Sequence, residues 1–322
     1  MAPRTSKEPR LRLVTYTSRG TTRSGAMVGP DHVVDLARGF TARAATGGTH
    51  TLRALPDDML GLLDLGDEGL DAARAVVAWA ESRLDDAALR DAGVLWRTDE
   101  AGFRLVAPIP EPRTVHAIGL NYRLHAEEMG AAIPERPIVF AKVRTCIIGS
   151  GEAIEIPKAS EQVDWEVELC FVIGKAGRHI AAKDALDHVA GYMNGNDVSV
   201  RDWQMHFPTW MMGKGFDTHG PIGPYLVTRD EVPDPHALKV QLWVNDVLKQ
   251  ESSTDDLIFN IPQIIEYVSE AVTLQPGDIF FTGTPAGVGM GRKPQEWMKV
   301  GDVVKVAIGN LGVLENPVIA EA

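Results

Sequence analysis

The chain has 322 residues, of which 44% are hydrophobic and 24% charged, a composition typical of a globular protein with one or two domains. Its formal net charge of −12 provides no basic surface for a phosphate backbone, so nucleic acid is not an expected partner. The two cysteines form no CxxC pair and support neither a disulfide framework nor a zinc ribbon, which indicates a reducing compartment.

The first residues show no targeting signal. The stretch 1–20 is polar and basic and lacks the apolar region of a secretory signal. No stretch approaches the roughly 18 apolar residues that a membrane-spanning helix needs. We therefore expect a cytoplasmic protein without a membrane partner.

The N-terminal third predicts a small α+β domain. Residues 11–36 contain two β-rich runs, and the second folds around the turn signal GPDH. From Leu62 to about Leu89 apolar residues recur at spacings of three and four, which predicts a helix.

A proline-rich segment separates this domain from the rest of the chain. Pro108, Pro110 and Pro112 exclude a helix there and remove backbone donors from any sheet. We place the boundary at this segment, which gives an N-terminal domain of residues 1–105 and a second domain of residues 106–322.

Short β-rich runs dominate the second domain. They are RPIVFAKV, AIEIP, DWEVELCFVIG, ALKVQLWVNDVL, GDIFFTGT and GDVVKVAIG. Helical patterns are few, the clearest being AKDALDHVAGYM and NIPQIIEYVSEAV, and they are too sparse for regular βαβ alternation. The sequence therefore predicts an α+β fold with a mainly antiparallel β core and peripheral helices.

The block GLNYRLHAEEMG predicts one short helix, with Asn121 as its N-cap and Gly130 as the residue that ends it. His125 and Glu128 are three residues apart on one face, so the carboxylate can orient the imidazole and raise its basicity. Such a pair suits a general base that acts on water. The alternative is an exposed helix in which a histidine lies near acids by chance.

Two glutamates, Glu166 and Glu168, interrupt the run DWEVELCFVIG, which otherwise predicts a buried strand. Because a strand turns successive side chains to opposite faces, these glutamates share one face with Asp164 and Cys170. Their backbones lie roughly 7 Å apart, so both side chains can converge on one cation. The alternative is that they line the solvated face of an ordinary amphipathic strand.

A third acid, Asp197, follows the turn signal Asn194–Gly195–Asn196 in the block GNDVSVRDWQ. It is a candidate third ligand, or alternatively an aspartate that only caps a turn. Three carboxylates without a histidine favour a hard divalent ion with open positions, hence Mg²⁺ or Mn²⁺ before Zn²⁺. Open positions would leave room for a substrate.

The block MMGKGFDTHGPIGP sets Lys214 between two glycines and predicts a shaped loop rather than regular structure. A lysine there could face an anionic substrate or an enolate, or it could simply be solvated. Residues 205–212, just before it, are rich in methionine and aromatic residues, which suit either a substrate wall or core packing.

The block FFTGTPAGVGMG predicts an anion cradle after a strand, in which backbone N–H groups around Gly283 and Thr284 are free to bind a carboxylate. It lacks the GK[ST] of a P-loop. Arg292 also stands where the last glycine of a GxGxxG motif belongs, so neither nucleotide-binding motif is present.

Together these blocks resemble the fumarylacetoacetate hydrolase family over about residues 105–322. The blocks that match in family order are GLNYRLHAEEMG, DWEVELCFVIG, GNDVSVRDWQ, GKGFDTHGPIGP and TGTPAGVG. The resemblance implies a mixed β-roll catalytic domain, a small N-terminal domain and a homodimer. It is closer to the acylpyruvase and hydroxyheptadienedioate isomerase branch, because Asn121 stands where the namesake branch has an aspartate ligand.

The resemblance also implies a role for each site residue. Mg²⁺ or Mn²⁺ would be held by Glu166, Glu168 and Asp197. His125 with Glu128 would form the water-activating pair, on a segment that becomes ordered when substrate binds. Lys214 would contact the metal-bound oxygens and Gln204 the substrate. Thr284 with Gly283 would hold the substrate carboxylate, while Arg201 and Asp202 would brace a loop.

The expected reaction is hydrolysis of a carbon–carbon bond in a 2,4-dioxo acid such as an acylpyruvate, through an enolate that the metal stabilises. The main alternative is a decarboxylase or keto–enol isomerase of a 2-oxo diacid, of the oxaloacetate or 2-hydroxyhepta-2,4-diene-1,7-dioate type. A third possibility is a metal-binding module without turnover, which would have no need of His125, Glu128 or Lys214.

Overall fold

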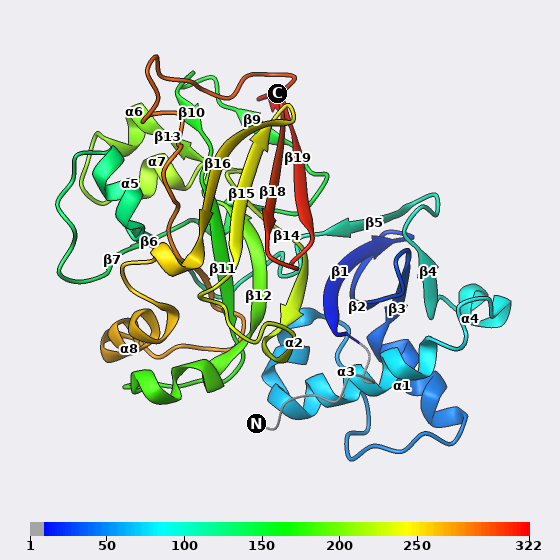
Figure 1. Cartoon of the computed structure of the whole chain (residues 1–322). Helices are drawn as coiled ribbons and strands as arrows, with labels where there is room; N and C mark the ends of the chain where they lie inside the picture. The colour runs from blue at the N-terminus through cyan, green and yellow to red at the C-terminus, as the bar shows by residue number, and fades with distance from the viewer. Residues whose placement is uncertain (1–9) are drawn as a thin grey trace.

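The computed structural model describes residues 10–322, and Figure 1 shows how its elements are arranged. The N-terminal part contains β1 (Arg12–Ser18), β2 (Thr21–Val28), β3 (His32–Asp35), β4 (Leu95–Arg97) and β5 (Phe103–Val106). β1, β2 and β3 pair antiparallel in sequence order, as the two β-rich runs and their turn signal predict. Gly29 makes the predicted turn with a left-handed backbone, φ +64°.

The helices of the N-terminal part are α1 (Leu36–Ala45), α2 (Met59–Asp64), α3 (Gly66–Ala80) and α4 (Ala87–Asp91). The single helix predicted from Leu62 to Leu89 is therefore wrong in extent. It breaks at Gly66, which has φ +57°, and again before α4, because the Asp86 carboxylate accepts hydrogen bonds from the N–H groups of Ala88 and Leu89.

The larger part of the chain continues the same sheet. The order is β4-β3-β2-β1-β14-β12-β11-β17-β6-β7, mostly antiparallel, with β17 and β6 parallel. β8 (Ile147–Ile148) also pairs with β14. The strands that the second part of the chain adds to this order are β6 (Val115–Gly119), β7 (Ile138–Ala141), β11 (Val167–Ile173), β12 (Val189–Asn196), β14 (Gly220–Thr228) and β17 (Ile279–Phe281).

A second sheet packs against this one, with the order β16-β15-β18-β19-β9. Figure 1 shows β15, β16, β18 and β19 alongside β11 and β12. Its strands are β9 (Ile154–Ile156), β15 (Lys239–Val244), β16 (Val247–Ser253), β18 (Val303–Ile308) and β19 (Val313–Ala320). The two short strands β10 (Val163–Asp164) and β13 (Ser199–Val200) pair with each other. The observed architecture is the expected α+β class.

The run ALKVQLWVNDVL folds as a hairpin rather than as one strand. Its turn residues, Asn245 and Asp246, both adopt left-handed backbone with φ 51° and 62°. Asn and Asp tolerate this conformation better than most residues, and it is the turn type that a two-residue hairpin favours.

The helices of the second part are α5 (Arg123–Glu128), α6 (Arg201–Gln204), α7 (Met211–Lys214) and α8 (Ile261–Ala271). α8 confirms the helix predicted for NIPQIIEYVSEAV, and Asn260 with Gln263 forms a capping box at its start. The helix predicted for AKDALDHVAGYM is wrong, because that segment is a 3₁₀ helix, Ala182–His188, followed by β12. Within the described residues, no helix is both long and apolar enough to cross a bilayer.

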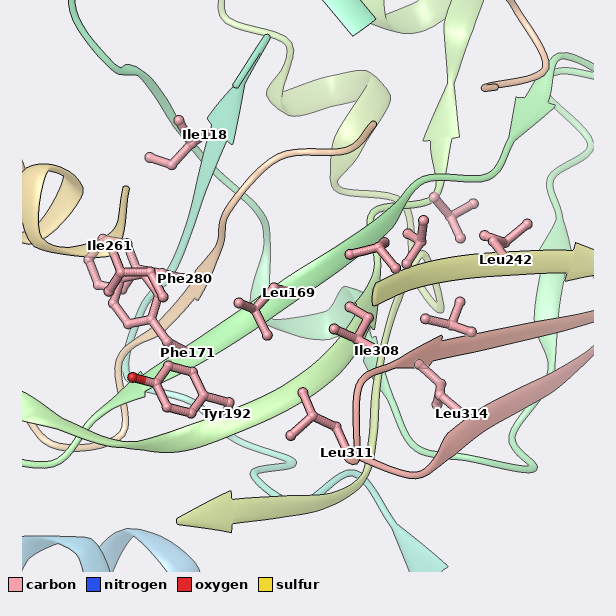
Figure 2. Close-up of a cluster of buried hydrophobic side chains, with 14 of the residues drawn as sticks. Ile118, Leu169, Phe171, Tyr192, Leu242, Ile261, Phe280, Ile308, Leu311 and Leu314 are labelled. Atoms are coloured by element: carbon pink, nitrogen blue, oxygen red, sulfur yellow. The ribbon is translucent and has the colours of Figure 1, made fainter. Parts of the chain in front are cut away.

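The hydrophobic core lies on both faces of β11. Leu169 and Phe171 point into one cluster, which Figure 2 shows together with residues of β15, β18 and β17, and the Phe171 and Phe280 rings stack at 4.6 Å. Cys170 and Val172 point into a second cluster that also contains Leu13 of β1. Because both faces of this strand are covered, any charged side chain on β11 is removed from solvent.

The second cluster extends from the N-terminal helices to β11, β14 and β17. β1 also pairs with β14, which joins the two parts of the sheet through Arg12 and Leu13. The division into residues 1–105 and 106–322 therefore stays a prediction about folding units.

We expect His219, which directly precedes β14, to make the protein less stable in mild acid. Burial lowers the pKa of this imidazole to about 4, and its Nε2 lies 2.8 Å from the carbonyl oxygen of Glu155. Since the unfolded chain binds a proton near pH 6.5 and the folded one only near 4, this stability is complete above 6.5 and falls by about 3 kcal/mol as the pH drops to 4. Urea midpoints between pH 4 and 7.5 would fall less steeply in His219→Gln than in the wild type. An equally steep fall in this variant would assign the acid sensitivity to other groups, and His206→Gln, an exposed position, is the control.

Candidate metal centre and active site

The three carboxylates predicted as ligands meet at one place. Glu168 is the second residue of β11, Glu166 directly precedes this strand, and Asp197 directly follows β12, the antiparallel partner of β11. One oxygen from each carboxylate lies within 4.8 Å of the others. Glu166, Glu168 and Asp197 are 4%, 2% and 0% exposed, so the interpretation as a solvated strand face is wrong.

The strand predicted over DWEVELCFVIG is interrupted at its start. β10 ends at Asp164 and β11 begins at Val167, because the Asp164 carboxylate accepts from the N–H of Trp165 and the Asn196 side chain accepts from the N–H of Glu166. Asn196 belongs to β12 rather than to the predicted turn. This irregular backbone lets Glu166 and Asp197 face each other, with the N–H of Asp197 2.9 Å from the Glu166 carbonyl oxygen.

Three buried cations surround these carboxylates. Lys214 Nζ donates to Glu166 Oε2 at 2.6 Å and to Asp197 Oδ2 at 2.8 Å. Lys142 Nζ donates to Asp197 Oδ1 at 2.5 Å. Arg201 lies 2.7 Å from Glu166 and 2.8 Å from Asp164. Lys214 ends α7 and so lies on a helix, not on the predicted loop.

The negative charge exceeds the positive charge in this cluster. Four carboxylates face three fixed cations: Asp164, Glu166, Glu168 and Asp197 against Lys142, Arg201 and Lys214. Burial and the charges of Asp197 and Glu166 raise the pKa of Glu168 well above its ordinary value. Burial also opposes the ionisation of Glu166, but Lys214 and Arg201 outweigh it and lower the pKa of Glu166 to about 2.

The donor set fits a hard divalent cation. Such ions take carboxylate oxygens, and Glu168 is the ligand that a further positive charge would ionise. Bound Mg²⁺ or Mn²⁺ would be held by Glu166, Glu168 and Asp197, which supports the predicted cofactor class, while the specific ion stays a prediction. Asn121 does not serve as a ligand, because its side chain is bonded to backbone groups of Phe259 and Thr282.

The predicted proton-transfer pair is formed. His125 Nδ1 lies 3.2 Å from Glu128 Oε2 on α5, and His125 is 6% exposed, so the interpretation as an exposed helix is wrong. The N-cap of α5 is Tyr122, not Asn121, because the Asn121 side chain is engaged elsewhere. Gly130 follows the helix with φ +63°, as predicted.

The glycine-rich loop after β17 binds carboxylates of the protein itself. The N–H of Gly283 donates to Glu168 at 2.6 Å, and the N–H of Gly287 donates to Glu128 at 2.9 Å. The N–H groups of Gly289 and Met290 donate to Asp164 at 2.6 and 2.9 Å. The prediction of an anion cradle is right in kind, but these N–H groups position the site's own acids rather than lie free for a substrate.

One cavity of about 230 Å³ joins these features. Its polar lining consists of His125, Glu166, Glu168, Asp197, Arg201, Gln204, Lys214 and Thr284. Gln204 accepts from Arg201 Nη1 at 2.8 Å, and Thr284 accepts from the Gln250 amide at 2.9 Å. The structure thus brings the predicted site residues to a single cavity except Glu128 and Gly283, which do not line it but contact His125 and Glu168. The individual roles of all these residues stay predictions.

Sequence reasoning missed two members of the site. Lys142 is buried in the carboxylate cluster, and Asp164 organises Arg201 together with the glycine-rich loop. The signal for Lys142 was the same as for the glutamates, namely a charged residue inside the largely apolar run RPIVFAKV. Asp202, predicted to brace a loop, accepts from the Ser160 hydroxyl at 2.7 Å.

An acidic centre at the adjoining ends of β11 and β12, with a histidine–glutamate pair beside the same cavity, fits an enzyme that acts on a small organic acid with a divalent ion. The chain belongs to the family whose model is described as "Fumarylacetoacetate (FAA) hydrolase C-terminal", which matches residues 114–319.

Curated relatives cover most of the chain. An oxaloacetate tautomerase of Xenopus laevis, described as mitochondrial, is 43% identical over 268 residues, which is 83% of this chain and 80% of that protein. A human oxaloacetate tautomerase, also described as mitochondrial, is 40% identical over 315 residues, which is 96% of this chain and 92% of that protein.

Solved structures confirm the family fold. A fumarylacetoacetate hydrolase from Exiguobacterium antarcticum is 32% identical with a TM-score of 0.77, and the match covers 97% of this chain and 100% of that one. A 2-hydroxyhepta-2,4-diene-1,7-dioate isomerase from Mycobacterium marinum is 28% identical with a TM-score of 0.68, covering 97% and 99%.

Proposed function

We propose that this protein catalyses the keto–enol tautomerisation of a small 2-oxo diacid of the oxaloacetate type, with Mg²⁺ or Mn²⁺ held by Glu166, Glu168 and Asp197. The observation that carries this proposal is that His125, paired with Glu128, lines the same cavity as the three carboxylates. The names of relatives that share 40–43% of their residues with the chain support the substrate class.

The chain's own residues can perform the proton transfers. When bound, the ion would draw electrons from the 2-oxo group and stabilise the negative charge of the enolate. His125 removes a proton from C3, which breaks the C3–H bond and leaves the enolate. Glu128 stabilises the imidazolium that forms, because its Oε2 lies 3.2 Å from Nδ1. A proton then binds the enolate oxygen and completes the enol.

The site also holds a donor for that oxygen. The Lys214 ammonium donates to Glu166 and Asp197 at 2.6 and 2.8 Å and lines the cavity. It would give a proton to the 2-oxo oxygen while His125 takes one from C3. The imidazolium then returns one proton to solvent and the Lys214 amine takes one up, which restores both groups. The net reaction is an isomerisation that consumes no co-reactant.

We rank tautomerisation above the hydrolysis predicted from the sequence. The same histidine could activate water, so the geometry serves both reactions. One solved neighbour is named a hydrolase and another an isomerase, but the two curated relatives, which share more of their sequence with the chain, are named tautomerases. Their names favour the alternative that the sequence left open. The homodimer and the cytoplasmic location stay predictions.

Ultraviolet spectroscopy tests the proposal directly. Enol-oxaloacetate is mixed with the protein and Mg²⁺ or Mn²⁺, and loss of the enol absorbance is followed beside release of pyruvate. We expect ketonisation to be at least about 10-fold faster than pyruvate release, and to stop when a chelator removes the ion.

A parallel assay with acylpyruvates measures carbon–carbon cleavage. If cleavage of an acylpyruvate, or decarboxylation of oxaloacetate, were faster than ketonisation, the tautomerase assignment would be wrong while the metal centre would stand.

A further inference from the structure

Part of the cavity lining is apolar. Beside the acidic centre the lining contains Phe140, Trp210, Met129, Met205, Met290 and Ile118. These are aromatic rings, thioethers and an aliphatic chain, so this part of the lining can make no charge-assisted hydrogen bond.

The cations that line the cavity are already engaged. Lys214 is bonded to Glu166 and Asp197, and Arg201 is bonded to Asp164, Glu166 and Gln204. Among the described residues that line the cavity, the remaining ionisable nitrogen group is His125, which faces Glu128. A substrate group that lies against these apolar side chains would therefore be favoured if it is apolar, because a carboxylate there would have no cation to pair with.

Trp210, one of the apolar residues that form a wall of the cavity with Phe140 and Met205, is held in a fixed position. This residue has φ 57°, an uncommon conformation for a side chain of its size, and such outliers persist where the surroundings fix them. Its indole packs edge-on to the Phe140 ring at 5.6 Å. A Cβ added at Gly119 would lie 2.2 Å from the indole, so only glycine there lets the ring lie against the end of β6.

Phe140 lies between the acidic centre and Trp210. Its ring centroid lies 5.5 Å from Lys214 Nζ and 5.6 Å from the Trp210 ring. A substrate whose carboxylate and oxo group face the acidic centre would thus reach the aromatic wall within the same cavity.

One methionine of the segment 205–212 is both exposed and part of the cavity. Met205 lines the cavity and is 66% exposed. Phe207, Met211 and Met212 follow it on the same segment and are also exposed, but they do not line the cavity. The interpretation of residues 205–212 as core packing is therefore wrong for these four side chains.

We infer that the site also tautomerises 2-oxo acids that carry an aromatic or bulky apolar group at C3, such as arylpyruvates, with Trp210, Phe140 and Met205 as the specificity-determining wall. This inference rests on the proposed function and names a second substrate class for it. The reaction is an isomerisation: the enol loses its O–H proton and gains a C3–H bond, so no co-reactant is needed.

Met205 and Met212 provide a matched pair for the test. Both are exposed methionines of one segment, at 66% and 53%, but only Met205 lines the cavity. Met205→Lys places a cation beside the apolar wall, and Met212→Lys places the same charge outside it. Trp210→Ala would remove more of the wall, but Trp210 is also the residue from which α7 starts, so the exposed methionines are the sharper probes.

Ketonisation of enol-phenylpyruvate and enol-oxaloacetate is measured for the wild type and both variants. We expect the wild type to convert both. The kcat/KM ratio of phenylpyruvate to oxaloacetate should fall at least about 10-fold in Met205→Lys and stay within about 2-fold in Met212→Lys. An equal fall in both variants would overturn the wall assignment.

The two proposals fail in different ways. A wild type that converts oxaloacetate but not phenylpyruvate would overturn this inference alone. A wild type that converts neither would overturn the proposed function and this inference with it.

Calorimetric binding of 3,3-dimethyl-2-oxobutanoate, an apolar 2-oxo acid with no hydrogen at C3, adds a readout without turnover. Its affinity should fall about 10-fold in Met205→Lys, while the affinity for oxalate should not. Equal affinity for the apolar acid in Met205→Lys and the wild type would overturn the wall.

Discussion

Replacing Glu168 with glutamine is expected to abolish tight Mn²⁺ binding and tautomerisation while leaving the ion-free protein at least as stable as the wild type. Glu168 is buried beside Asp197 and Glu166, and its pKa is raised by burial first and by these two charges second. Glutamine keeps the shape and can still accept from the Gly283 N–H. It removes a carboxyl group whose ionisation the ion-free site opposes, and with it the ligand that a bound ion would ionise.

The expected loss of Mn²⁺ affinity is about 100-fold or more, because even residues that only orient metal ligands contribute 10- to 100-fold. Thermal unfolding measures both effects. Saturating Mn²⁺ should raise the midpoint of the wild type by about 5 °C, and should leave that of the variant unchanged. An equal rise in Glu168→Gln would show that the ion binds elsewhere.

Glu166→Gln is the matched control, because it changes a ligand of the same type with the opposite effect on the ion-free protein. Glu166 is paired with Lys214 at 2.6 Å and Arg201 at 2.7 Å, and these buried cations would lose a partner. We expect a loss of about 3 kcal/mol in the free energy of unfolding before any ion is added. The two variants should therefore differ in ion-free stability although both bind Mn²⁺ weakly.

The sequence predicts the parts of this fold that local patterns determine. The N-terminal hairpins follow from apolar runs around a turn, and α8 follows from Asn260, its capping partner and an amphipathic face. The segment AKDALDHVAGYM shows where local patterns fail. Its end becomes β12, since pairing with β11 and β14 on both edges outweighs a weak helical preference.

The site likewise has residues that the sequence predicts and contacts that it does not. Glu166 and Glu168 were detectable because carboxylates in an apolar run are costly to bury and so indicate a reason for being there. Their pairing with Lys142, Arg201 and Lys214 was not, because these cations come from three separate segments that only the tertiary structure brings together. Which carboxylates the N–H groups of the glycine-rich loop bind also depends on tertiary structure. A sequence does not show whether a backbone N–H group is free or already hydrogen-bonded.

The second large effect is expected at His125. His125→Gln should lower kcat for enol-oxaloacetate by about 10² to 10⁴-fold, because a positioned general base contributes that much. Mn²⁺ affinity should stay within about 3-fold of the wild type, since His125 lies on α5 and is bonded to Glu128 rather than to the three carboxylates. Deuterium incorporation at C3 of ketonic substrate in D₂O should fall in parallel, which places the lost step at that carbon. Glu128→Gln should have a smaller effect of about 10-fold, because the imidazole remains but loses its charged partner.

His206→Gln controls for the loss of an imidazole in the segment 205–212, because His206 is exposed and does not line the cavity. It should retain wild-type activity. If His125→Gln instead kept its rate of deuterium exchange within about 3-fold, the proton at C3 would be handled by another group, and Lys214 would be the next candidate because its ammonium is the cavity's other proton carrier beside the carboxylates. The metal centre would survive that result, since the Glu168 variant tests it independently.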